Sequence, residues 1–129
     1  MDTEARDAFD RAIADLRALS QLKPESPDVH NQIGKALRDQ GKPDEAIAEF
    51  RTAILLKPDD ADAHDNLGGA LRDQGKLDEA ITEGRTALRL KPEFALAHSN
   101  LGSALYGQGK LEEAIQASAW RLTASGSRR

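Results

Sequence analysis

Three histidines, His30, His64 and His98, are the side chains that most readily suggest chemistry, because imidazole is a common metal ligand. They follow one another at intervals of 34 residues. In stacked helices, such equivalent positions lie roughly 8–10 Å apart per packing step. One zinc ion, in contrast, needs each ligating nitrogen at about 2 Å. The spacing therefore favours a packing role for the histidines, and we predict no metal site and no cofactor.

Other catalytic chemistries lack their motifs. The sequence has no glycine-rich phosphate loop after a strand, no nucleophile elbow and no HExxH zinc motif. Because there are no cysteines, disulfides, thiolate catalysis and thiolate–metal sites are excluded. Carboxylates are abundant, but they stand in pairs at predicted helix starts, such as Asp44-Glu45 and Asp78-Glu79. We therefore predict no catalytic residue, and that the protein is not an enzyme.

Binding is the chemistry that the polar residues favour. The amides Gln32, Asn66 and Asn100 recur at the same interval as the histidines. Each carries a donor and an acceptor, so a ladder of them can pair with a peptide backbone of any sequence. Basic side chains beside them would add charge-assisted bonds to acidic groups. The alternative is an ordinary solvated helix face. The predicted peptide-binding residues are Asn31, Gln32, Lys35, Arg38, Asp62, Asp65, Asn66, Arg72, Ser99, Asn100 and Tyr106.

The elements that would position these residues also recur along the chain. A chain that repeats in this way is an array of one supersecondary unit, in which each unit buries its apolar face on the next. We predict an all-α solenoid of about seven helices, with an A helix and then a B helix in each repeat. The coincident positions are Ile13, Ile47, Ile81 and Ile115; Gly34, Gly68 and Gly102; Gly41, Gly75 and Gly109; and Pro24, Pro58 and Pro92.

Helix-start and helix-stop residues place the boundaries of the repeats. Ser26 and Pro27 are suited to an N-cap and the first helical position. Gly41 and its equivalents are suited to the left-handed residue that ends an A helix. The predicted units are a single B-type helix in 1–26, full repeats in 27–60 and 61–94, a degraded third repeat in 95–122 and a disordered tail in 123–129.

Two residues depart from this pattern. Gly84 stands where the first repeat has Phe50, so it marks either a gap that a partner fills or a loss that a neighbouring side chain compensates. Phe94 stands where Ser26 and Asp60 would cap the A helices, so the third repeat is expected to start without a side-chain cap.

The repeats resemble those of the tetratricopeptide repeat family. The NLG segments and LKP endings look most like the superhelical arrays of O-linked N-acetylglucosamine transferases and of bacterial scaffolding proteins. The resemblance implies a right-handed superhelical solenoid of antiparallel helix pairs, whose A helices line a concave wall that grips extended peptides. Chaperone-tail binding is not expected, because Leu96 and Asn100 stand where a carboxylate clamp needs positive charge. In the second repeat, the matching residues are His64, Leu67-Gly68, Ala80, Ala87 and Pro92, with Gly84 at the aromatic position.

Apolar residues at the two ends of the array suggest a different working surface. A solenoid normally ends in a polar capping helix, and exposed apolar patches usually mark association sites. The alternatives to peptide binding are therefore a self-associating scaffold or the recognition arm of a larger enzyme. The candidate residues for self-association are Phe9, Ile13, Leu16, Trp120 and Leu122.

The overall charge narrows the class of partner. The formal net charge is −4, and acidic and basic residues are interspersed, which argues against a nucleic-acid or anionic-membrane surface. The N-terminal residues lack the apolar segment of a signal peptide, and no apolar run is long enough to span a membrane. We therefore expect a cytoplasmic protein whose partner is a protein or a peptide.

Overall fold

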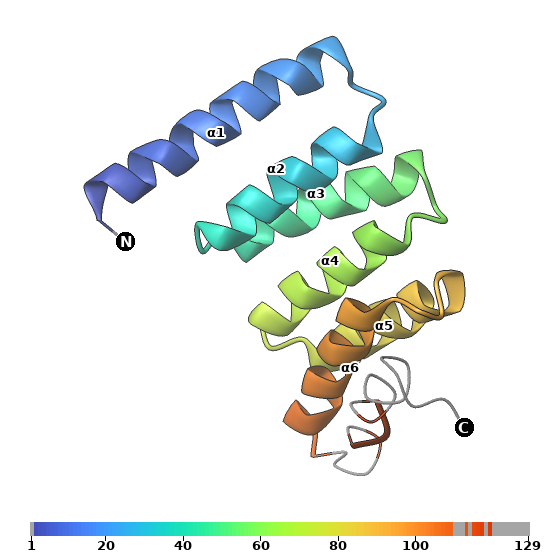
Figure 1. Ribbon diagram of the computed structural model, residues 1–129. Helices are drawn as coiled ribbons and strands as arrows, with labels where there is room; N and C mark the ends of the chain where they lie inside the picture. The colour runs from blue at the N-terminus through green and yellow to red at the C-terminus, as the bar shows by residue number, and fades with distance from the viewer. Residues whose placement is uncertain (1, 110–112, 114, 118, 120–129) are drawn as a thin grey trace.

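The computed structural model describes residues 2–109, 113, 115–117 and 119. The described residues form no strand, and the prediction of an all-α solenoid is confirmed (Figure 1). Residues 113, 115–117 and 119 are helical and fall within the seventh predicted helix. The rest of that helix and the predicted disordered tail, 123–129, lie outside the described residues. The helices are α1 (Thr3–Leu22), α2 (Pro27–Asp39), α3 (Pro43–Leu56), α4 (Ala61–Asp73), α5 (Leu77–Leu90) and α6 (Ala95–Gly107).

The predicted start and stop residues act as expected. The Ser26 hydroxyl accepts a hydrogen bond from the Val29 amide at 3.4 Å, and Asp60 accepts one from the Ala63 amide at 3.2 Å. Phe94 precedes α6 without a side-chain cap, as predicted. Three glycines, Gly41, Gly75 and Gly109, end the A helices with φ of 84°, 81° and 79°, a conformation that other residues adopt only with strain.

The stacking of the helices defines an inner side. Each helix contacts the next along the chain, and the A helices α2, α4 and α6 also contact one another in succession. In the described part of the chain, the backbones of the B helices α1, α3 and α5 do not approach one another as closely, and these helices meet through long side chains such as those of the Arg51–Glu79 ion pair. The A helices therefore lie on the tighter, inner side of the array, and the B helices lie on the outer side (Figure 1).

His30 and His64 have the packing role predicted for them, because each connects the two helices of its own repeat. His30 Nδ1 lies 2.9 Å from Glu49 Oε1, and its Nε2 lies 3.2 Å from the Pro24 carbonyl oxygen. The equivalent His64 makes the same two contacts in the second repeat. Each ring thus connects an A helix to its B helix and to the preceding loop. In the described part of the chain, no three potential metal ligands come together.

Two buried glycines inside helices, Gly34 and Gly84, have different surroundings. A Cβ at Gly34 would lie 2.4 Å from Cε1 of the fully buried Phe50, so the first repeat needs glycine there. Gly84 is also buried, but a Cβ there would meet the Leu101 side chain at 3.4–3.5 Å, which is ordinary contact. Leu101 therefore packs directly against α5 at Gly84, which is consistent with compensation by a neighbouring side chain.

The two glycines predict opposite effects of one substitution. In Gly34→Ala, steric overlap with Phe50 should cost about 1–3 kcal/mol, which outweighs the helix propensity of alanine. In Gly84→Ala, the higher helix propensity of alanine should raise the free energy of unfolding by up to about 1 kcal/mol. Urea denaturation followed by circular dichroism measures both. Equal destabilisation of the two variants would contradict this account of the packing.

Candidate peptide-binding groove

A cavity of about 250 Å³ lies on the inner side of the array. Residues of α2 and α4 form most of its lining, and residues around the start of α6 complete it. It therefore joins three successive A helices. The lining residues are Asp28, Asn31, Gln32, Lys35, Asp62, Asp65, Asn66, Phe94 and Leu96.

Four of the predicted residues present their side chains at this cavity. Gln32 and Lys35 of α2 and Asp62 of α4 are exposed, and Asn66 of α4 is half-buried. Gln32 and Asn66 occupy equivalent places in successive repeats, so two amides of the predicted ladder line the same cavity. Each can donate to and accept from a bound backbone.

Asn31 lines the cavity, and its side chain also links two parts of the fold. Its side chain is only 7% exposed, and its Nδ2 donates to Asp60 Oδ2 at 3.0 Å. Because Asp60 caps α4, this bond ties α2 to the start of the next A helix. The Asn31 Oδ1 atom is buried and has no hydrogen-bond partner among the described residues.

Asp65 is a buried carboxylate that binds Asn100, the third amide of the predicted ladder. It is 2% exposed, and Asn100 Nδ2 donates to its two carboxylate oxygens at 3.0 and 3.3 Å. Burial raises the pKa of Asp65 above its ordinary value, although the Asn100 bond and the nearby Arg38 and Arg72 oppose the rise. The Asn100 amide nitrogen is thus already engaged within the chain.

Arg38 is also held within the chain. Its Nε and Nη2 donate to the two carboxylate oxygens of Asp73 at 2.6 and 3.4 Å, which links α2 to α4. A Cβ at Gly69 would lie 2.6 Å from Arg38 Nη1, so the guanidinium crosses α4 where a larger residue would block it. This bidentate pair fixes the position of the two A helices.

A comparison with known families decides the identity of the array. Residues 31–93 and 85–125 match the family model described as tetratricopeptide repeat. The chain belongs to the tetratricopeptide repeat family. Its repeats and fold support a protein–protein interaction module of a generally non-catalytic kind. No curated protein matched the chain.

Solved structures of similar shape are themselves repeat arrays. A crystal structure of MamA protein is 27% identical, with a TM-score of 0.80 over 91% of this chain and 64% of that chain. The MamA RS-1 ArsTM double mutant is 20% identical, with a TM-score of 0.83 over 92% of this chain and 66% of that one. MamA MSR-1 C2 is 24% identical, with a TM-score of 0.77 over 92% and 68%. This chain thus spans about two thirds of the length of the MamA chains that it matches.

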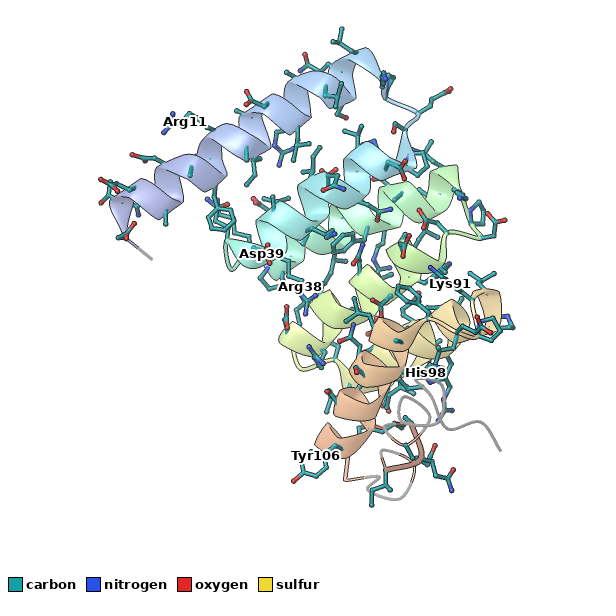
Figure 2. All side chains as sticks on the ribbon, viewed as in Figure 1. Arg11, Arg38, Asp39, Lys91, His98 and Tyr106 are labelled. Atoms are coloured by element: carbon teal, nitrogen blue, oxygen red, sulfur yellow. The ribbon has the colours of Figure 1, made fainter. Side chains whose placement is uncertain are left out.

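Other predicted binding residues of this tetratricopeptide repeat array lie away from the cavity. Arg72 and Ser99 are half-buried, and Tyr106 is exposed near the end of α6 (Figure 2). The sequence prediction omitted Asp28, Phe94 and Leu96, which do line the cavity. Phe94 and Leu96 differ in type from the residues at the equivalent positions of the other repeats, and these differences are the signal in the sequence that could have identified this wall.

The residues predicted for self-association have varied environments. Ile13 is buried in the core, Leu16 packs against the core, and Phe9 is half-buried. Trp120 and Leu122 lie outside the described residues. None of the helices in the described part is long and apolar enough to cross a membrane.

The raised pKa of Asp65 predicts a pH-dependent stability. Between the pKa of an unfolded aspartate and the higher pKa of Asp65, the folded chain binds more protons than the unfolded chain. The contribution of Asp65 to the free energy of unfolding therefore falls as pH rises through this range. In Asp65→Asn this loss is absent, while the side-chain oxygen can still accept from Asn100. The free energy of unfolding of the variant, relative to wild type, should therefore increase from acidic to neutral pH.

Urea denaturation of both proteins across this pH range provides the measurement. Asp59→Asn removes one exposed carboxylate that is not among the groups shifting the pKa of Asp65, and it controls for the change in net charge. A stability difference between Asp65→Asn and wild type that falls as pH rises would contradict the assignment.

Proposed function

We propose that repeats 27–60 and 61–94 bind an extended peptide segment of a partner protein in the groove that contains this cavity. The observation that carries the proposal is the placement of Gln32 and Asn66, equivalent amides of adjacent A helices, on one cavity. A segment lying across the A helices would meet one amide from each repeat, and these amides would pair with its backbone. Such binding is non-catalytic and needs no cofactor.

The groove is organised before any ligand arrives. Three interhelical contacts hold the A helices in place: Asn31 with Asp60, Arg38 with Asp73, and Asn100 with Asp65. A preorganised site loses less conformational entropy on binding than a flexible one. The cavity is also smaller than the roughly 300–1,000 Å³ of typical small-molecule sites, which favours a single side chain of a longer segment over a cofactor.

A groove variant tests this proposal. In Gln32→Ala/Lys35→Ala/Asn66→Ala, the substituted residues are exposed or half-buried, so the helices should be retained. Loss of several hydrogen bonds should weaken a bound peptide by about tenfold or more. Peptides selected on the wild type from a random displayed library provide the ligand, and fluorescence anisotropy measures their binding to each variant.

The matched control is Arg51→Ala/Glu79→Ala, which removes an exposed ion pair from the outer B helices. This control should bind as the wild type does, with equal helicity by circular dichroism. Selected peptides that bind the groove variant as tightly as the wild type would refute the groove as the binding surface.

A second candidate function, self-association, is favoured by exposed leucines on the B helices. Leu22 at the end of α1 is 81% exposed, and Leu55 near the end of α3 is 82% exposed. If these apolar surfaces pair between copies, Leu22→Ser/Leu55→Ser should lower the mass measured by light scattering toward that of the monomer. Ala14→Ser/Ala48→Ser changes exposed positions of the same helices and should leave the mass unchanged. A wild type that is monomeric at every concentration would exclude this function.

A further inference from the structure

The cavity has a carboxylate side and an apolar side. Asp28 of α2 and Asp62 of α4 occupy equivalent places in the first two repeats, and the buried Asp65 adds a third carboxylate. In the third repeat, the equivalent of Asp28 and Asp62 is the exposed Leu96. Leu96 lines the cavity together with Phe94. A ligand that suits this cavity must therefore combine an apolar stem with a group that satisfies acceptors.

A buried acceptor also lies in the wall of this cavity. Asn31 lines the cavity, is more than nine-tenths buried, and its Oδ1 has no hydrogen-bond partner among the described residues. The Nδ2 of Asn31 already donates to Asp60, so the atom of this amide without a partner among the described residues is the acceptor Oδ1. The carboxylate of Asp65 also keeps lone pairs beyond the two contacts from Asn100.

We propose that this cavity is a subsite for a lysine or arginine side chain of the segment bound in the groove. The inference rests on the proposed peptide-binding function. Lysine and arginine carry donors and no acceptor, and their methylene stems pack on apolar surface. The stem lies along Leu96 and Phe94, and the cationic head donates toward Asp62 and Asp65.

Two cations of the chain, Arg38 and Arg72, act on Asp65, but neither lines the cavity. Arg38 gives two of its donor nitrogens to Asp73 on the adjacent helix. Lys35 lines the cavity from an exposed position, and it is outnumbered there by the three carboxylates. Lys91 does not line the cavity, but its Nζ lies 4.7 Å from the centre of the Phe94 ring and already occupies one face of that ring.

Other occupants fit the cavity less well. A C-terminal carboxylate would meet Asp28, Asp62 and Asp65 at close range, and like charges disfavour one another. A metal ion would need a cluster of ligands, and the described residues contain no group of three or more that could hold one. A basic side chain therefore remains the occupant that satisfies both the carboxylates and the apolar side.

The test begins with peptides selected on the wild type from a random displayed library and counter-selected on Gln32→Ala/Lys35→Ala/Asn66→Ala. We expect the groove-dependent peptides to share a lysine or arginine at one position. A selected lysine peptide is then synthesised with norleucine in place of that lysine, which keeps the stem and removes the charge. A selected arginine is replaced by citrulline, which has almost the same shape. On the wild type, the neutral analogue should bind about tenfold more weakly.

Two variants locate the effect. On Asp62→Asn, the affinity ratio between the basic peptide and its neutral analogue should shrink severalfold, because the cation loses one carboxylate. Asp59→Asn makes the same change of charge at an exposed residue that does not line the cavity, and it should leave the ratio unchanged. Circular dichroism confirms that both variants keep the helicity of the wild type.

The remaining outcomes separate the two proposals. Groove-dependent peptides without a shared basic residue would overturn the subsite and leave the peptide groove standing. A ratio that Asp62→Asn does not change would likewise overturn the subsite alone. A library that yields no groove-dependent peptide would overturn both the groove and the subsite.

Discussion

The side-by-side packing of the A helices is the constraint on which the rest of the structure depends. The backbones of α2, α4 and α6 approach one another in succession more closely than those of the B helices do, so the inner surface of the array is built from A-helix side chains. Residues without a Cβ assist packing at two places. Gly34 admits the Phe50 ring of the B helix within a repeat, and Gly69 leaves room for the Arg38 guanidinium between two A helices. A side chain at Gly34 would overlap the buried Phe50 ring, whereas one at Gly69 would displace the flexible end of Arg38.

Polar contacts then fix how the A helices lie relative to one another. Asp65 illustrates the balance of energies, because its burial disfavours the charged form while Asn100, Arg38 and Arg72 favour it. A buried carboxylate whose charged form is disfavoured by burial is a poor source of stability. Its bonds to Asn100 restrict how α4 and α6 can lie relative to one another.

The periodicity of the sequence predicts the fold well, and it predicts the groove less completely. Ser26, Asp60 and Gly41 end or begin helices through interactions within a few residues, so a local pattern is enough to find them. Contacts between A helices join residues whose separation in the sequence differs from the repeat interval. Asn100 bonds Asp65 at a separation of 35 residues, and Asn31 bonds Asp60 at 29, whereas the repeat interval is 34. Aligning the repeats places like residues together and therefore conceals these partners.

The positions where the repeats differ are also those that give the groove its chemistry. Buried positions such as Ile47 and Ile81 keep one residue type, because each repeat must fill a similar space. The positions that line the cavity do not keep one residue type. The place of Asp28 and Asp62 holds Leu96 in the third repeat, and Asn31 becomes Asp65 in the second. An identical wall in every repeat would offer the same contacts at each step, so only a departure can distinguish one part of a bound segment from another. Two such departures, Leu96 and Asp65, meet at one cavity, which argues that the cavity is where this array selects among partners.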